Sequence, residues 1–130
     1  MDRLTERTDR NGAARQWEYD RLSRTTKENW KTAAGGSFAG KYEFSHDLAD
    51  QLTEVRLNTG SAVNPTHAFT YDKRGRVTEQ TQRVGARAFN SSQTFDDLDR
   101  RKTLALQSTV GGTGFPPTGG AVTADFKNFY

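Results

Sequence analysis

The sequence predicts an all-β protein in which antiparallel β-hairpin repeats form a curled sheet. Two observations predict this fold class: a turn motif recurs at nearly constant intervals, and aromatic residues alternate along the segment before each turn. The clearest copy of the motif is the segment 69–79, with the sequence FTYDKRGRVTE. A period of this length is typical of units that bury their apolar faces against their neighbours.

The turn at the centre of each copy begins with an aspartate. Four aspartates, spaced 27, 25 and 24 residues apart, mark the copies: Asp20, Asp47, Asp72 and Asp96. An aspartate followed three residues later by a glycine, as in Asp72 and Gly75, favours a type I turn that glycine closes in the left-handed conformation. Other residues stand at the glycine position in the remaining copies: Ser23, Asp50 and Asp99. Those turns are expected to be strained or differently shaped.

The register of each hairpin follows from placing the aspartate opposite an arginine four residues later. Three such pairs are present: Asp20 with Arg24, Asp72 with Arg76, and Asp96 with Arg100. In the reference copy this register pairs Tyr71 with Val77, Thr70 with Thr78, and Phe69 with Glu79. In the second copy it pairs His46 with Leu52 and Ser45 with Thr53. Such cross-strand pairs stabilise antiparallel strands, and the aspartate–arginine pair is expected to fix the register at the turn.

The residues before each turn predict an aromatic face. They recur at alternating positions: Trp17 and Tyr19, Phe44 and His46, Phe69 and Tyr71, then Phe95. A spacing of two places them on one face of a strand. A second turn follows about thirteen residues after the aspartate, at Gly60 and Gly85, so each unit contains two turns and two strands.

The repeats are predicted to span residues 1–109. The turn Asp9–Gly12 is interpreted as a second turn, and Arg3–Glu6 then aligns with Arg76–Glu79, so the chain is expected to begin within a repeat. Residues 110–123, rich in glycine and proline, predict a loop or linker, and residues 124–130 a further repeat strand. A short helical turn has room only at Lys27–Lys41.

Composition excludes several classes of protein. Only 22 of the 130 residues are Leu, Ile, Val or Phe, so the aromatic rings must compensate for a small apolar core. The 19 basic and 16 acidic residues are interspersed, which argues against a nucleic-acid surface. Cysteine is absent, which excludes disulfides and thiolate chemistry. The first 20 residues contain no apolar segment, so no signal peptide or membrane span is predicted.

No catalytic, cofactor-binding or metal-binding residue is predicted. Ser45, His46 and Asp47 resemble a triad only in composition, because adjacent strand residues point to opposite faces. His67 has no partner in the sequence. The segment 96–99 and the pair Asp9 and Asn11 carry oxygen atoms, but lack the ligand pattern that calcium requires. Turn chemistry accounts for them.

The motif Tyr71-Asp72 followed by Gly75-Arg76-Val77-Thr78 resembles the YD repeat, also called the rearrangement hotspot (RHS) repeat. The resemblance runs from about Arg3 to about Leu106. Families with this repeat include bacterial RHS polymorphic toxins, the C components of insecticidal toxin complexes, and the extracellular teneurins. The resemblance implies a β-sheet that spirals into a hollow shell around a toxin or structural core. Four copies would form only part of such a wall.

The resemblance therefore implies a non-catalytic structural module in a larger secreted or cell-surface protein, which scaffolds or encapsulates a toxin. Its partners would be further YD repeats of that protein and an enclosed toxin domain, and the parent protein would direct its export. The alternative is a carbohydrate-binding or adhesion surface, because exposed aromatic rings can stack on sugars. A third reading, a hydrolase hidden in the loops, is favoured by no group of residues.

Overall fold

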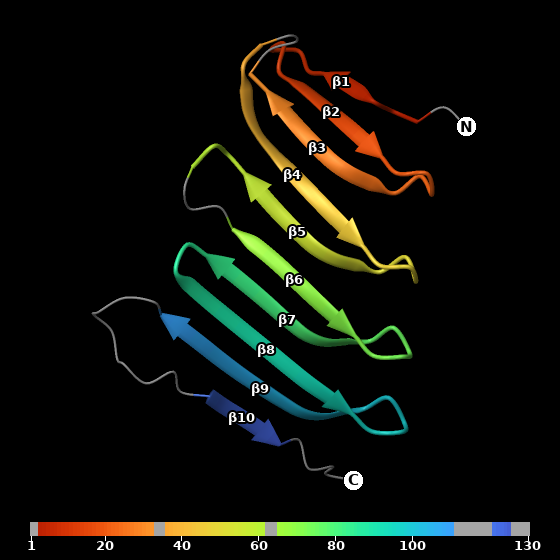
Figure 1. Cartoon of the computed structure of the whole chain (residues 1–130), viewed down its shortest axis with the longest axis vertical. Coiled ribbons are helices and arrows are strands. Elements are labelled where there is room, and N and C mark those ends of the chain that lie inside the picture. Colours follow the sequence, from red (N-terminus) through yellow and green to blue (C-terminus); the bar gives the residue numbers. More distant parts are fainter. Residues whose placement is uncertain (1–2, 33–35, 62–64, 111–120, 126–130) are drawn as a thin grey trace. The chain divides into compact units, whose positions relative to one another are not determined.

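The computed structural model describes residues 3–32, 36–61, 65–110 and 121–125 (Figure 1). This part of the chain is all-β and contains no helix, which confirms the predicted fold class. Its strands are β1 (Glu6–Thr8), β2 (Ala14–Tyr19), β3 (Thr25–Lys31), β4 (Phe38–His46), β5 (Leu52–Asn58), β6 (Thr66–Tyr71), β7 (Val77–Val84), β8 (Arg87–Phe95), β9 (Arg101–Val110) and β10 (Ala121–Asp125).

The chain divides into two compact units, Met1–Asn64 and Pro65–Tyr130. In the first unit, strands β1 to β5 pair in chain order, each antiparallel to the next. Strands β6 to β10 pair in the same way in the second unit. The described strands of each unit therefore form a single antiparallel layer.

Two segments stood apart from the predicted repeat strands. The described part of Lys27–Lys41, the one segment with room for a helical turn, lies largely in β3 and β4 and contains no helix. Gly36 and Gly40 in this segment disfavour a helix, whereas the aromatic residues Trp30 and Phe38 favour a strand. Within the predicted linker 110–123, Val110 ends β9 and Ala121 begins β10, while 111–120 lie outside the described residues. The same is true of 126–130 in the predicted final strand.

The cross-strand register matches the prediction next to each turn and departs from it one pair further away. Tyr71 faces Val77, and His46 faces Leu52, as predicted. Beyond these pairs the predicted partners are wrong: Thr70 faces Glu79, Phe69 faces Gln80, and Ser45 faces Glu54. The physical reason is a β-bulge, which inserts one extra residue in the returning strand.

The bulge occurs at the same position in all four motif hairpins. The register shifts at Glu18/Tyr19, Ser45/His46, Thr70/Tyr71 and Thr94/Phe95. The inserted residues are Thr26, Thr53, Thr78 and Lys102. The motif threonine is thus the bulged residue in three hairpins, although the Thr78 and Thr70 hydroxyl oxygens still lie 3.1 Å apart. A bulge repeated at one position bends every hairpin in the same way.

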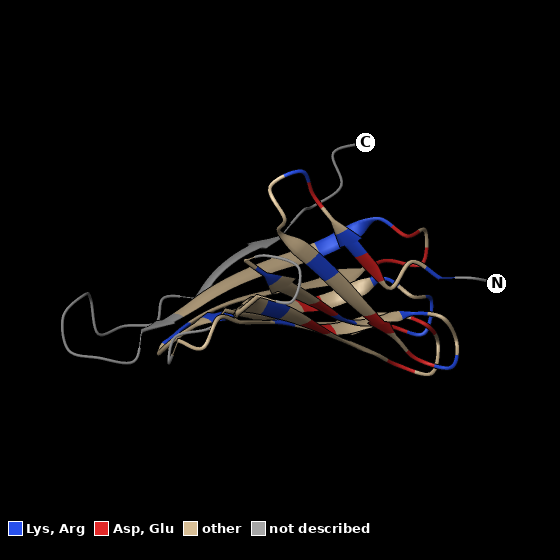
Figure 2. Ribbon diagram, turned by 90° about the horizontal axis from the view of Figure 1, so that it is seen from above, with Lys and Arg blue, Asp and Glu red and all other residues tan. Residues whose placement is uncertain are grey.

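The two faces of the first unit differ in chemistry. Alternation and cross-strand pairing place aromatic and aliphatic side chains together on one side, here called the aromatic face: Trp17, Tyr19, Trp30, Tyr42, Phe44, Val55 and Leu57. The opposite face carries ion pairs, at 2.8 Å between Lys27 and Glu18 and at 2.6 Å between Lys41 and Glu43. Figure 2 shows how acidic and basic residues intermingle along the strands and turns.

The second unit has a corresponding aromatic face with fewer rings. Its members are Phe69, Tyr71, Phe89, Phe95, Leu104 and Leu106, together with several amide and hydroxyl side chains. The opposite face is rich in threonine, as in the pair Thr94 and Thr103, whose hydroxyl oxygens lie 2.6 Å apart.

Neither unit buries a large side chain among the described residues. Ala14 is their one buried hydrophobic residue, with 1% of its surface exposed, and no polar residue among them is buried. Phe89 and Leu106 are each half exposed. A single layer has no second layer to cover its apolar face.

Candidate functional site

The aspartate of the motif caps its own turn. The Asp72 Oδ1 atom accepts hydrogen bonds from the backbone N–H groups of Arg74 at 2.9 Å and Arg76 at 3.0 Å, while Oδ2 accepts one from Arg76 Nε at 2.7 Å. The backbone N–H of Gly75 donates to the Asp72 carbonyl at 3.0 Å. One side chain therefore satisfies three donors and closes the loop.

The other three aspartates cap their turns in the same way. Asp20, Asp47 and Asp96 each accept from the backbone N–H groups two and four residues later. Arg24 Nε donates to Asp20 at 2.6 Å, and Arg100 Nε donates to Asp96 at 2.7 Å. Gln51 stands at the arginine position of the second copy.

The turns without glycine keep the shape of the glycine turn. The φ angle is 71° at Ser23, 65° at Asp50 and 63° at Asp99, close to the 79° of Gly75. Of the two predicted outcomes, the different shape is wrong, because these residues adopt the left-handed conformation that is costly for L-amino acids. Their side chains offset this cost by contacting an arginine of the preceding hairpin.

The arginine of one hairpin reaches the turn of the next. Arg24 Nη1 donates to the Asp47 carbonyl at 2.9 Å and lies 3.4 Å from Asp50 Oδ1. In the second unit Arg76 donates to the Asp99 carboxylate, which also accepts from Arg74 Nη1 at 2.7 Å. The residue that replaces glycine is thus the acceptor for the preceding arginine.

Arg3, which aligns with Arg76, makes the corresponding contacts at the first motif turn. Its Nη1 atom lies 3.1 Å from the Asp20 carbonyl and 3.3 Å from Ser23 Oγ. Its guanidinium carbon lies 5.1 Å from the centre of the Tyr19 ring, and that of Arg76 lies 4.4 Å from the Phe95 ring. Arginine therefore links adjacent hairpins through both the turn and the last aromatic residue before it.

The prediction from sequence placed these arginines only within their own hairpins. The sequence nevertheless contained a signal for the contact between an arginine and the turn of the next hairpin. Where a copy has arginine four residues after the aspartate, the next copy has serine or aspartate at the glycine position. The copy with Gln51 is followed in the sequence by the copy with Gly75.

The turn contacts hold the carboxylates ionised. The Arg76 guanidinium and the backbone N–H groups of Arg76 and Arg74 lower the pKa of Asp72 below its ordinary value. The backbone N–H and guanidinium of Arg100 lower the pKa of Asp96 in the same way. Hydrogen bonding to Asp20 raises the pKa of Arg24.

The structure does not bring together the residues of a catalytic or metal site. His46 lies on the aromatic face opposite Leu52, Ser45 lies opposite Glu54 on the other side, and the Asp47 carboxylate caps its turn. His67 lies in β6 opposite Gln82. Across the described ranges, no three His, Cys, Asp or Glu side chains are grouped so that they could hold a metal ion.

A hollow lies on the aromatic face of the first unit. It has a volume of about 610 Å³, and Arg7, Arg15, Trp17 and Trp30 contribute to its lining. The indole N–H of Trp30 donates to Glu28 Oε1 at 2.9 Å, and Arg15 Nη1 contacts the same oxygen at 3.1 Å. We call this feature the tryptophan hollow.

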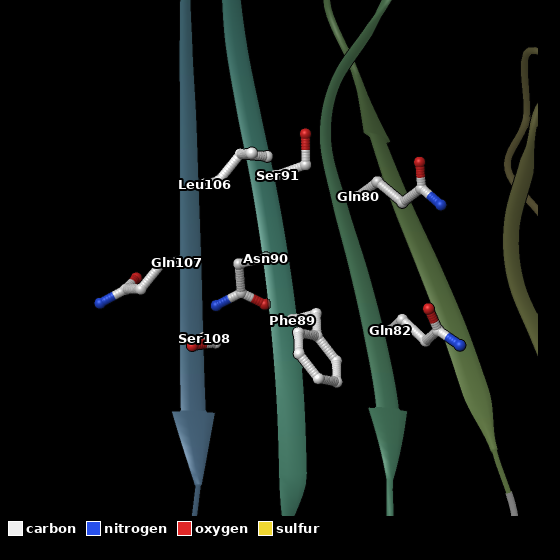
Figure 3. Close-up of a pocket in the computed structure, with 8 residues that line it drawn as sticks. All are labelled: Gln80, Gln82, Phe89, Asn90, Ser91, Leu106, Gln107 and Ser108. Atoms are coloured by element: carbon white, nitrogen blue, oxygen red, sulfur yellow. The ribbon is translucent and has the colours of Figure 1, made fainter. Parts of the chain in front are cut away.

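A second hollow, of about 550 Å³, lies within the second unit. Its lining residues are uncharged: Gln80, Gln82, Phe89, Asn90, Ser91, Leu106, Gln107 and Ser108. Figure 3 shows that they come from three neighbouring strands, β7, β8 and β9. Amides and hydroxyls surround a partly exposed phenylalanine there, so this hollow offers hydrogen bonds but no charge.

Among the described residues, no helix is long and apolar enough to cross a membrane. No protein-family model matches the sequence. A search of curated proteins likewise finds no significant match. The function of the chain must therefore follow from its own geometry.

Proposed function

We propose that this chain is a non-catalytic structural module, a segment of the wall of a larger RHS-type protein that is secreted or displayed at the cell surface and that scaffolds or encapsulates a toxin. The observation that carries the proposal is the single-layer sheet with two unlike faces. Tyr42 and Phe44 lie on one face of the first unit, whereas Lys41 and Glu43 form an ion pair on the other.

The aromatic face of the first unit has the chemistry of a surface that a second layer covers. Trp30 and Tyr42 pack edge to face with ring centres 4.8 Å apart, and the rings of Tyr42 and Phe44 lie 6.1 Å apart. Such pairs contribute about 0.5–1.5 kcal/mol each beyond the area they bury. They nevertheless leave the rings partly exposed, since no described residue of the first unit forms a second layer over them. A further polypeptide layer would remove this surface from water.

The use of the charged residues supports a structural role. The aspartates and arginines that recur in the motif are committed to turn caps and to contacts between hairpins, as with Asp72 and Arg76. Groups whose hydrogen-bonding capacity is already filled in this way are poorly placed to transfer protons or attack a substrate. The same contacts favour a stack of hairpins with defined spacing, as a wall requires.

The proposal is tested on the full chain in solution. We expect association that increases with concentration in sedimentation velocity, because open sheet edges offer unpaired backbone groups, and we expect binding of the dye ANS to the aromatic face. Phe89→Ser should reduce dye binding, whereas Ala88→Ser on the opposite face of the same strand should not. A monomer that melts cooperatively and binds no dye would contradict the proposal.

A sugar-binding or adhesion surface is the second candidate, and the two tryptophans in one hollow favour it. Aromatic rings present flat apolar surfaces on which sugar rings can stack. Binding to a glycan array that is abolished by both Trp17→Ala and Trp30→Ala, in variants that keep the far-UV circular dichroism of the parent chain, would support this candidate. Unchanged binding in either variant would exclude the hollow as its site.

A further inference from the structure

We propose that the tryptophan hollow binds an acidic and apolar segment of the polypeptide that the wall faces. A carboxylate of that segment would lie against Arg7, and an apolar side chain would lie on the ring of Trp30. The existence of such a polypeptide rests on the proposed function, whereas the chemistry of the site rests on the contacts of the hollow itself.

The Trp30 ring is held in a fixed orientation. Gly40 lies opposite Trp30 in β4, and a Cβ atom added at Gly40 would lie 3.1 Å from Trp30 Cε3. The ring therefore lies directly over the glycine backbone. Tyr42 contacts it edge to face, and the hydrogen bond to Glu28 satisfies its N–H group. A ring that is oriented before binding loses little conformational entropy when an apolar group packs on it.

The hollow has an excess of positive charge. Arg7 and Arg15 face each other directly across β1 and β2, a cross-strand arrangement of like charges that is destabilising. Lys31 adds a third cation to the lining, where Asp9 is the one carboxylate among the described residues, and Asp9 already accepts hydrogen bonds from the backbone of its own turn. Glu28, beside the hollow, contacts Arg15. No described residue forms an ion pair or hydrogen bond with the Arg7 side chain. A carboxylate beside Arg7 would relieve the repulsion and form charge-assisted hydrogen bonds.

The charge distribution elsewhere favours an acidic partner at this place in particular. On the opposite face of the same unit, Lys27, Lys41 and Arg56 each have a carboxylate partner. The hollow of the second unit has no charged lining. The volume of the tryptophan hollow lies in the range of small-ligand sites, which suits two or three side chains rather than a folded domain.

Intrinsic fluorescence reports on the site directly, because Trp17 and Trp30 are the two tryptophans of the chain and both line the hollow. The full chain is titrated with acetyl-Leu-Glu-Phe-Glu-Leu-amide and with the same peptide carrying glutamine in place of glutamate. We expect a saturable fluorescence change with the acidic peptide, about tenfold weaker binding of the glutamine peptide, and weaker acidic-peptide binding as salt increases.

Arg7→Gln tests the proposed contact, and it is compatible with the fold because Arg7 lies exposed in the short strand β1. This variant should bind both peptides equally and weakly. Arg56→Gln is the matched control, because it removes a guanidinium from the opposite face, and it should keep the preference for the acidic peptide. A preference that survives Arg7→Gln would overturn the proposal.

Two further outcomes would also overturn it. One is the absence of any fluorescence change up to millimolar peptide. The other is tighter binding of tri-galacturonate than of the acidic peptide, which would assign the hollow to sugars. Failure of this inference is distinguishable from failure of the wall proposal, because chain association and dye binding are measured without peptide and do not depend on Arg7.

Discussion

At the scale of the residue, the left-handed position of each motif turn decides which side chain is tolerated. Gly75 occupies it without a steric penalty, whereas Asp50 and Asp99 occupy it at a cost and accept hydrogen bonds from Arg24 and Arg76. Each strained aspartate therefore also contacts the arginine of the preceding hairpin. Replacing the arginine alone should be destabilising, because the strain at the aspartate would remain without the contact.

Gly75→Ala is expected to lower the free energy of unfolding by about 1–2 kcal/mol, because a Cβ atom is disfavoured at a φ of 79°. Lys73→Ala, in the same loop, is the control and should have little effect. Urea unfolding followed by circular dichroism gives both values. Equal stability of the two variants would mean that the turn does not require the left-handed conformation.

Gly40→Ala is expected to shift the Trp30 ring, since the new Cβ atom would lie 3.1 Å from Cε3 and 3.4 Å from the Asn58 carbonyl oxygen. Overpacking of this kind costs about 1–3 kcal/mol, and the tryptophan fluorescence should change with it. Gly60→Ala has no atom within 4 Å of its Cβ but has a φ of 75°. This control should lose stability and leave the emission spectrum unchanged.

At the scale of the element, the unit of construction is a hairpin with a capped turn, a bulge and an arginine that reaches the next hairpin. In the first unit, Arg24 connects the turn that begins at Asp20 to the turn that begins at Asp47. The order of the hairpins is therefore fixed at their turns as well as by the backbone ladder between strands.

Arg24→Gln is expected to loosen two turns rather than one. Amide hydrogen exchange should accelerate at Ala49 and Gln51, in the next hairpin, as well as at Leu22 in its own turn. Arg21→Gln, three residues earlier in the same loop, should leave exchange at Ala49 and Gln51 unchanged. If Arg24→Gln affects only its own turn, the contact to Asp47 does not stabilise the neighbouring hairpin.

The capped turns also make stability depend on pH. Because the pKa of Asp72 in the folded chain lies below the ordinary value of 3.8, its contribution is complete above that value and is lost as the pH falls through the folded pKa. Asp20 and Asp96 have lowered pKa values as well. Stability should therefore fall below about pH 4. Asp72→Asn should reduce this dependence in thermal melts, whereas Lys73→Ala in the same loop should not.

These elements explain how far the sequence could predict the structure. Turn positions and aromatic alternation follow from local rules, so the hairpins and the Tyr71–Val77 pair were predictable. The bulge at Thr78 could not be predicted, because the sequence around a bulged threonine does not differ from that around a paired one. The contact between Arg76 and Asp99 was missed because it joins two copies of the motif, whereas the register was predicted within each copy separately. The tryptophan hollow was missed because Trp30 lies outside the motif.

At the scale of the whole molecule, each unit is a layer without a buried core of large side chains among its described residues. Its stability must come from backbone ladders, capped turns, links between hairpins and partly exposed rings. Such a layer is suited to separating two environments, with the aromatic rings on one face and mainly charged or hydroxyl side chains on the other. The wall proposal depends on this difference between the faces.

The most direct test compares this chain alone with the longer protein in which the proposal places it, using two chemical probes. In the longer protein, Trp30, Tyr42 and Phe44 should lose reactivity toward hydroxyl radicals, because the aromatic face is covered. Glu18, Glu43 and Glu54 on the opposite face should keep their reactivity toward carbodiimide. Aromatic residues that remain as reactive as in the isolated chain would contradict the account.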